Sequence, residues 1–226
     1  MRSRYPEAED TSALKEIYEL KGSYCEEYAE EYKRIHSPLK GDDYFTLAEI
    51  YIEMEDYEKA KDLLSHITPA SMFDDINQGQ FEHLWITILL YTQRWEDALE
   101  RYKKNRSFLD VFMSNPVRAS IAGDYNENAA ILSAIDEEKE DVETYLSRLR
   151  EWCDMFPKNR MQVSITEAEV LFATGKEEKA EDALHTIEQD ILLNNKYKYE
   201  WERENMLKKL YRARRLKRGE SPRTFH

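Results

Sequence analysis

The segment of residues 42–67, DDYFTLAEIYIEMEDYEKAKDLLSHI, constrains the fold more than any other part of this chain. Its apolar residues recur at steps of three and four, which places them on one face of an α-helix. Glu55 and Asp56 interrupt the periodicity, so the segment predicts two short amphipathic helices joined by a tight turn. Neither helix can bury its apolar face alone, and such a hairpin therefore needs neighbours of the same kind. The two faces comprise Leu47, Ala48, Tyr51 and Met54, then Tyr57, Ala60, Leu63, Leu64 and Ile67.

Similar hairpins are predicted further along the chain. In residues 80–105 the small residue Ala98 opens a second helix, 38 positions after Ala60. Val142 takes the equivalent place 44 positions later, and Ala180 follows it by 38. Valine is larger than alanine, so the hairpin with Val142 is the weakest match. A recurring unit of this size indicates an array of helical pairs.

The motifs Leu47-Ala48-x-x-Tyr51, Asp56-Tyr57-x-x-Ala60 and Leu64 resemble the tetratricopeptide repeat (TPR) family, in which small residues let paired helices pack closely. The resemblance covers roughly residues 42–194. It implies an all-α fold: one domain, residues 1–226, in which antiparallel helical hairpins form a right-handed superhelical array, or α-solenoid, with a C-terminal capping helix. The expected repeats span residues 10–36, 42–67, 80–105, 124–154 and 161–194, followed by a capping helix and a basic tail over 196–226.

The connection between the expected repeats of residues 80–105 and 124–154 is predicted to be irregular. Ser107 and Asp110 indicate the start of a short separate helix. Pro116 predicts a bend, because its ring clashes with a continuing helix. A new helix is then expected from Asp124.

Other boundaries follow from capping and turn residues. Ser164 with Glu167 three positions later is typical of a capping box and predicts a helix start there. Residues 70–79 are predicted to be irregular. In the first hairpin the residues expected on the buried face are Cys25, Tyr28, Ala29, Tyr32 and Ile35.

Composition agrees with a helical protein that has a core. Hydrophobic residues make up 41% of the chain, and Gly and Pro occur only six times each, which disfavours a β-sandwich or barrel. No apolar run approaches the ~20 residues of a membrane span. The first residues lack the apolar segment of a secretory signal, and Cys25 and Cys153 show no metal-ligand spacing. We therefore expect two buried thiols, no membrane contact and a cytoplasmic protein.

Charge is distributed unevenly. The net charge is −13, yet residues 208–226 contain eight Lys and Arg and one acid. A strongly acidic body repels phosphates, so direct nucleic-acid binding is not expected and a basic or amphipathic protein partner is. Two interpretations of the basic end remain open: a solvated helix end, or a segment that binds an acidic surface such as that of a second copy, giving a homo-oligomer.

Catalytic and metal-binding patterns are missing from the sequence. There is no HExxH, CxxC or G-x-S-x-G, and no Gly-rich loop that could hold a phosphate. His185 lies between Asp182 and Glu188 on one helix face, which is typical of an exposed histidine rather than a metal ligand. We expect a non-enzymatic protein without a cofactor or a metal.

The TPR resemblance also implies a binding groove, lined by the first helix of each pair. A well-known form of this groove grips a terminal carboxylate with Lys and Asn, but here Phe45 and Glu49 stand at those positions, and an acid repels a carboxylate. An acidic groove favours a basic or amphipathic ligand. The expected groove residues are Phe45, Glu49, Ile52, Glu53, His83, Thr87, Leu90, Tyr91, Asn128, Ile131, Ile165 and Glu169.

These observations predict a protein- or peptide-binding module that uses its concave groove. Fifteen Tyr and four Trp favour this, because both supply broad contact surface with a polar group. Two alternatives remain. The chain could be a peptide-sensing regulatory domain of a transcription or signalling system, or a structural subunit that self-associates.

Overall fold

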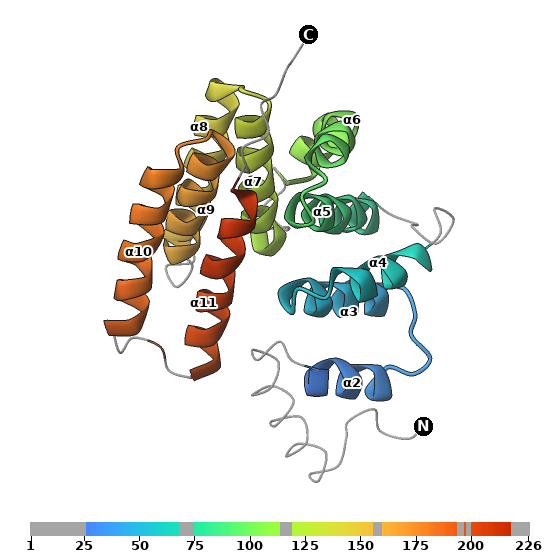
Figure 1. The fold of residues 1–226 in the computed structure, drawn as a ribbon. Helices are drawn as coiled ribbons and strands as arrows, with labels where there is room; N and C mark the ends of the chain where they lie inside the picture. Colours follow the sequence, from blue (N-terminus) through green and yellow to red (C-terminus); the bar gives the residue numbers. More distant parts are fainter. Residues whose placement is uncertain are drawn as a thin grey trace.

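The described part of the chain is all-α. The computed structural model describes residues 26–67, 75–113, 119–155, 160–193, 197 and 200–217. Within these ranges there are ten α-helices, one 3-10 helix and no strand (Figure 1). None of the described helices is both long enough and apolar enough to pass through a membrane. The elements are α2 (Glu26–Ile35), α3 (Asp42–Glu53), α4 (Tyr57–Ser65), α5 (Asp75–Tyr91), α6 (Trp95–Met113), α7 (Ala119–Ile135), α8 (Lys139–Met155), α9 (Arg160–Ala173), α10 (Glu177–Leu193), α11 (Glu200–Ala213) and η4 (Arg214–Leu216).

Eight of these helices form four pairs, α3–α4, α5–α6, α7–α8 and α9–α10, each joined by a very short turn. Such turns make the two helices of a pair antiparallel. Ala60, Ala98 and Ala180 are fully buried near the start of the second helix of their pairs, where a larger side chain would separate the helices. Each first helix also contacts the first helix of the next pair, so α3, α5, α7 and α9 follow one another.

The four turns inside the pairs share one backbone geometry. The amide of Asp56 donates to the carbonyl of Tyr51 at 2.8 Å, and the amide of Lys176 donates to that of Leu171 at 2.9 Å, five positions earlier in both cases. This hydrogen bond closes a Schellman motif, which needs one residue with positive φ. Those residues are Glu55 (61°), Gln93 (61°), Glu137 (65°) and Gly175 (72°). Only the last turn has the glycine that this conformation favours, so a glycine search would find one turn of the four.

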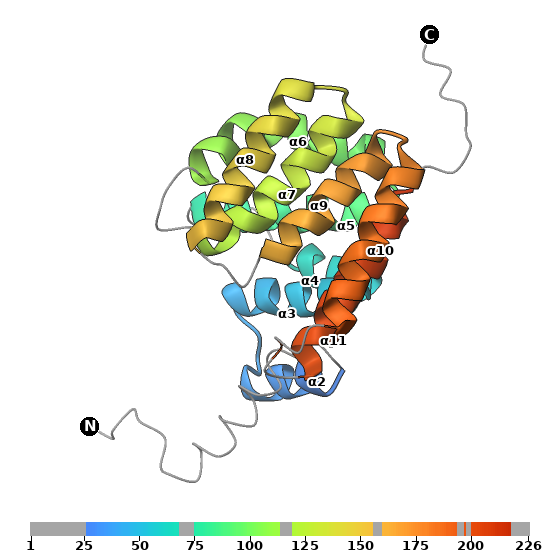
Figure 2. The same ribbon diagram turned by 90° about the vertical axis from the view of Figure 1, so that its left-hand side faces the viewer.

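The C-terminal helix returns to the early part of the chain. Figures 1 and 2 show α11 beside α9 and α10, on the side of the molecule where α3 lies. The short η4 helix continues from α11 and contacts α9 and α5. One hydrophobic core runs from α2 through to η4, since Leu210, Ala213 and Leu216 belong to the same buried cluster as Tyr28 and Ala29.

Several predicted helix boundaries are wrong. Helix α6 continues without a break to Met113, so Ser107 and Asp110 lie inside it rather than capping a separate helix. The reason is that α8 and α7 supply partners for the polar side chains of this half of α6, among them Arg106. Helix α7 begins at Ala119, before the expected Asp124.

Two further helices, α9 and α5, also begin earlier than predicted. Helix α9 begins at Arg160, which places the predicted capping box of Ser164 and Glu167 inside the helix. Helix α5 begins at Asp75, so the second half of the segment predicted to be irregular is helical. In α2, Tyr28 and Ala29 are buried as expected, but Ile35 is 46% exposed.

Some predictions fall on residues outside the described ranges. These are the first helix of the first hairpin, Cys25, Pro116 and the tail beyond residue 217. Cys153 is described, and its side chain is buried as expected. Burial raises the pKa of this thiol, so it stays protonated and is a poor nucleophile.

Candidate functional site

Most of the expected groove residues meet on one surface, which we call the inner wall. It is formed by α3, α5, α7 and α9 and surrounds a small cavity of about 30 Å³. Seven of the twelve expected residues line this cavity: Glu49, Ile52, Glu53, His83, Thr87, Tyr91 and Asn128. The other apolar ones, Phe45, Leu90, Ile131 and Ile165, are buried in the core and do not line it. Glu169 joins the wall through Tyr91, whose hydroxyl donates to Glu169 Oε1 at 2.8 Å.

The inner wall is covered by the chain's own C-terminal helix. Lys209 and Arg212 of α11 line the same cavity as the wall residues. The side chain of Arg212 is only 7% exposed; its Nη1 lies 3.5 Å from Glu53 Oε1, and its Cζ lies 4.5 Å from the centroid of the Tyr91 ring. The interpretation of the basic end as a solvated helix terminus is therefore wrong for Arg212.

The neighbouring basic residues also pair with the acidic body. Arg214 contacts Glu181 at 3.0 Å, and Lys217 contacts Glu177 at 3.1 Å. Arg215 pairs with Glu55, at the turn between α3 and α4. The charge asymmetry of the sequence thus becomes a set of contacts between α11–η4 and the two ends of the helical array.

Two buried carboxyl groups lie beneath Arg212. Burial raises the pKa of Glu169 to about 8, and the neighbouring Glu127 adds to the shift, so Glu169 carries a proton at neutral pH. Glu127 is itself 6% exposed and accepts a hydrogen bond from Gln162 Nε2 at 2.7 Å. Burial alone would raise the pKa of Glu53, but Lys209 and Arg212 outweigh it and hold that pKa below its usual value.

The polar contacts at this site are incomplete on one side only. Asn128 Nδ2 donates to Thr87 Oγ1 at 2.7 Å and lies 3.3 Å from His83 Nδ1, so this part of the wall is well connected. Next to it, Arg212 Nε and Glu169 Oε2 are both buried without a hydrogen-bond partner. Buried polar atoms are nearly always hydrogen-bonded, which makes this pair of atoms unusual.

Sequence reasoning missed Arg212, Lys209, Glu127 and Gln162 as members of this site. A signal for Arg212 was present. It stands between Leu210 and Ala213 in a helix, and both of these are fully buried with Leu216. A lone arginine within an apolar face indicates a buried cation that needs an acidic partner.

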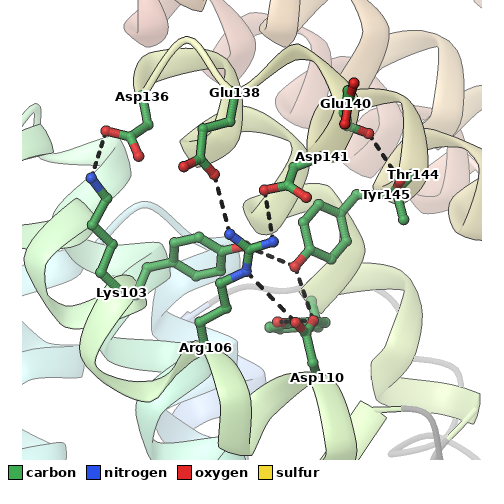
Figure 3. Close-up of polar contacts among 11 residues, drawn as sticks. Lys103, Arg106, Asp110, Asp136, Glu138, Glu140, Asp141, Thr144 and Tyr145 are labelled. Atoms are coloured by element: carbon green, nitrogen blue, oxygen red, sulfur yellow. Dashed lines mark hydrogen bonds and ion pairs between the residues drawn. The ribbon is translucent and has the colours of Figure 1, made fainter.

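A second arginine cluster joins α6, α7 and α8 (Figure 3). Arg106 lies 2.7 Å from Asp141 and 3.1 Å from Glu138, and its Nε is 3.7 Å from Asp110. Tyr125 and Tyr145 each donate to Asp110 Oδ1 at 2.9 Å, and Tyr102 donates to the Tyr145 hydroxyl at 2.9 Å. This cluster was not predicted.

The turns α7–α8 and α9–α10 border a larger, open groove of about 980 Å³. Its lining combines acidic residues, two lysines and apolar residues. The residues that line it are Ala134, Glu137, Glu138, Lys139, Glu140, Asp141, Val142, Val170, Leu171, Ala173, Thr174 and Lys176. Within the ranges that the structure describes, His, Cys, Asp and Glu side chains nowhere gather in threes that could hold a metal ion.

Comparison of the chain with protein-family models, with curated proteins and with solved structures finds no match.

Proposed function

We propose that this chain is a non-enzymatic protein-binding module of TPR-like architecture, a right-handed array of helical pairs, whose inner wall takes a basic amphipathic helix of a protein partner. Two features of the fold support the architecture: the four turns of shared geometry, and the succession of first helices on one side. Glu49, Glu53 and Glu127 give the wall its acidic character. A wall of this charge favours a cationic partner.

The observation that carries this proposal is the packing of α11 and η4. This segment buries Leu210, Ala213 and Leu216 and directs its cations to acids of the body, among them Glu53 and Glu55. It has the features of a helix bound in a groove, with apolar anchors and charged flanks. A partner helix with the same pattern would meet the same complementary surface.

A titration of two labelled synthetic peptides into the full-length chain tests the proposal. One has the sequence of residues 205–217, and in the other every Lys and Arg of that sequence is replaced by Glu. The basic peptide is expected to bind with an affinity that falls as salt is added, and the acidic peptide is expected not to bind. Equal affinity for both peptides, or binding of neither, would contradict the proposal.

A matched pair of variants locates the binding surface. Glu49 is exposed on the inner wall, whereas Glu100 is exposed on the outer helix α6. Glu49→Lys is expected to weaken capture of the basic peptide and to reduce its salt dependence, while Glu100→Lys leaves both unchanged. If Glu100→Lys has the larger effect, the peptide binds elsewhere, and the groove beside Val142 and Val170 becomes the next surface to test.

A second candidate function is self-association through the basic end. The contacts Arg212–Glu53 and Lys217–Glu177 join α11–η4 to the body within one chain, and the same contacts could form between two chains that exchange this segment. Light scattering at low and high salt tests this. A dimer that dissociates with salt and is lost on truncation after Leu207 supports exchange; an unchanged monomer mass in both forms at low salt excludes it.

A further inference from the structure

The surroundings of Arg212 suit a guanidinium group specifically. Its planar head lies over the Tyr91 ring at 4.5 Å, and the Glu53 carboxylate lies at its edge. A guanidinium is planar, delocalised and weakly hydrated, so it can stack on an aromatic ring and be buried at a lower desolvation cost than a lysine ammonium. Glu127 and Glu169, both buried, approach from α7 and α9.

Arg212 fills this site imperfectly. Its contact with Glu53, at 3.5 Å, is longer than a strong charge-assisted hydrogen bond. Arg212 Nε and Glu169 Oε2 are both buried and lack hydrogen-bond partners, although they belong to the same site. A cavity of about 30 Å³ remains between α11 and the wall. Unpaired buried polar atoms raise the free energy of the docked arrangement, so α11 is held less firmly than its buried apolar residues alone would suggest.

Two ion pairs of this segment are also weak. Arg215 and Lys217 make ion pairs while their own side chains stay about half exposed, at 48% and 47%. Exposed ion pairs contribute little to stability. The segment is therefore suited to exchange with a competitor that makes better contacts to the same wall.

We propose that the inner wall contains a guanidinium-binding site, formed by Glu53, Tyr91 and Glu169 and occupied here by Arg212 of the same chain, which accepts an arginine side chain of the partner helix when α11 leaves. This inference rests on the proposed function for the origin of the competing arginine. The recognised pattern is the one that α11–η4 itself displays, Leu210-x-Arg212-Ala213-x-x-Leu216. The expected partner segment is therefore an amphipathic helix in which an arginine equivalent to Arg212 lies among apolar residues equivalent to Leu210, Ala213 and Leu216.

Chemical rescue of full-length Arg212→Ala tests the site without any partner. Ethylguanidinium replaces the atoms of the side chain that alanine lacks, so it is expected to raise the melting temperature of this variant in a saturable manner at millimolar concentration. Ethylammonium at equal ionic strength is expected to have little effect, because a compact ammonium neither stacks as well nor spans the same donors. Arg214→Ala is the control, since Arg214 is one-third exposed and leaves no enclosed site. If ethylguanidinium shifts the melting temperatures of Arg212→Ala and Arg214→Ala by the same amount, the site does not exist.

A second variant keeps the test decisive if Arg212→Ala does not fold. Arg215→Glu combined with Lys217→Glu weakens the attachment of η4 and leaves Arg212 and its surroundings intact. The peptide of residues 205–217 is expected to bind this variant on the order of ten-fold more tightly than the same peptide with Lys at its Arg212 position. Equal affinity of the two peptides would overturn the guanidinium site.

The two hypotheses fail in different ways. Rescue by ethylguanidinium, with no binding of the peptide of residues 205–217 or of its version with Lys at the Arg212 position, would keep the guanidinium site and remove the proposed function. Binding of these two basic peptides with equal affinity, without rescue, would keep the protein-binding function and remove the site. Failure of both measurements would overturn both.

Discussion

Arg106 and Arg212 both lie among carboxyl groups, yet their surroundings differ in almost every other respect. Arg106 is 32% exposed and reaches three carboxylates, two of them within 3.1 Å. Arg212 is 7% exposed, has one carboxylate at 3.5 Å, and lacks a partner at Nε. The more exposed arginine therefore has three carboxylate partners, whereas the buried arginine has a single carboxylate partner at a longer distance.

The two arginines also differ in what they connect. Arg106 and its tyrosine neighbours join α6, α7 and α8, which are consecutive along the chain, and this accounts for the continuation of α6 beyond residue 105. Arg212 joins α11 to α3, 159 positions away. We infer that the Arg106 cluster serves the architecture, whereas the Arg212 site is a docking contact with a partly unsatisfied occupant. The comparison predicts different responses to charge reversal, pH, salt and turn substitution.

The largest effect is expected from Glu53→Lys. This change places a third cation beside Lys209 and Arg212 and leaves the buried guanidinium without its carboxylate. Breaking a buried ion pair from one side lowers the free energy of unfolding by about 3–5 kcal/mol. Glu49→Lys, one turn earlier and exposed, is the control and is expected to change it by about 0.5 kcal/mol or less. Urea denaturation measures both, and two equally small changes would mean that α11 does not depend on this contact.

Glu169→Gln is expected to remove a pH dependence. The pKa of Glu169 is about 8 in the folded protein against 4.5 for an ordinary glutamate. Because the folded state binds this proton more tightly, the contribution of Glu169 to stability is complete at acidic pH and is lost as the pH rises toward 8. The groups that face it are Glu127 from α7, Tyr91 from α5, and Lys209 and Arg212 from α11.

Glutamine keeps the shape and an acceptor for Tyr91 but does not titrate. Between weakly acidic pH and pH 8, the free energy of unfolding should therefore fall more steeply in the wild type than in Glu169→Gln. Glu167→Gln, on the same helix but 42% exposed, is the matched control and should follow the wild type. Identical slopes in all three proteins would show that Glu169 is ionised in the folded state.

Arg106→Ala is expected to lower the free energy of unfolding by less than Glu53→Lys does, and added salt should reduce this loss. Partly exposed ion pairs contribute about 1 kcal/mol or less, although the removal of Arg106 also leaves Asp110, Glu138 and Asp141 facing one another. Raising the salt concentration screens both the attraction in these ion pairs and the repulsion among the three carboxylates. The difference in the free energy of unfolding between variant and wild type should therefore shrink. A loss as large as that of Glu53→Lys, and insensitive to salt, would erase the distinction between the two clusters.

The smallest effect is expected from the same substitution in two equivalent turns. Glu137→Gly in the α7–α8 turn relieves a left-handed conformation and should stabilise the protein by about 0.5–1 kcal/mol. Glu55→Gly in the α3–α4 turn relieves the same strain but also loses the ion pair with Arg215, so it should stabilise less. Thermal denaturation distinguishes them, and equal gains would mean that the Arg215 contact contributes nothing.

Local patterns were sufficient to predict the helical pairs. The spacing of Ala60, Ala98, Val142 and Ala180 matches that of the four turn residues, because each small side chain follows its turn by five positions. Apolar periodicity and a short polar interruption determine such a hairpin within some 25 residues. Seven of the expected groove residues lie together for the same reason, since corresponding faces of successive first helices adjoin.

The position of α11 could not be predicted in this way. The contact between Arg212 and Glu53 is not local, and a run rich in Lys and Arg has the composition of a solvated helix end. Glu169 was expected in the groove, but its burial is equally difficult to predict, because an acid in a helix is usually exposed and this burial depends on Tyr91, 78 positions earlier. Residues 105–113 were misjudged because their polar side chains find partners on α8 that only the folded chain supplies.

Hydrogen–deuterium exchange of the full-length chain, with and without an isotope-labelled peptide of residues 205–217, tests the central claim most directly. Amides exchange through local opening, so a helix that leaves the inner wall loses protection without unfolding of the rest. We expect the peptide to accelerate exchange in α11 while α3 and α5 stay protected and the Arg106 region of α6–α8 is unchanged. If the peptide binds and α11 keeps its protection, or if α11 exchanges only together with the core helices, the inner wall is not a site where one basic helix replaces another.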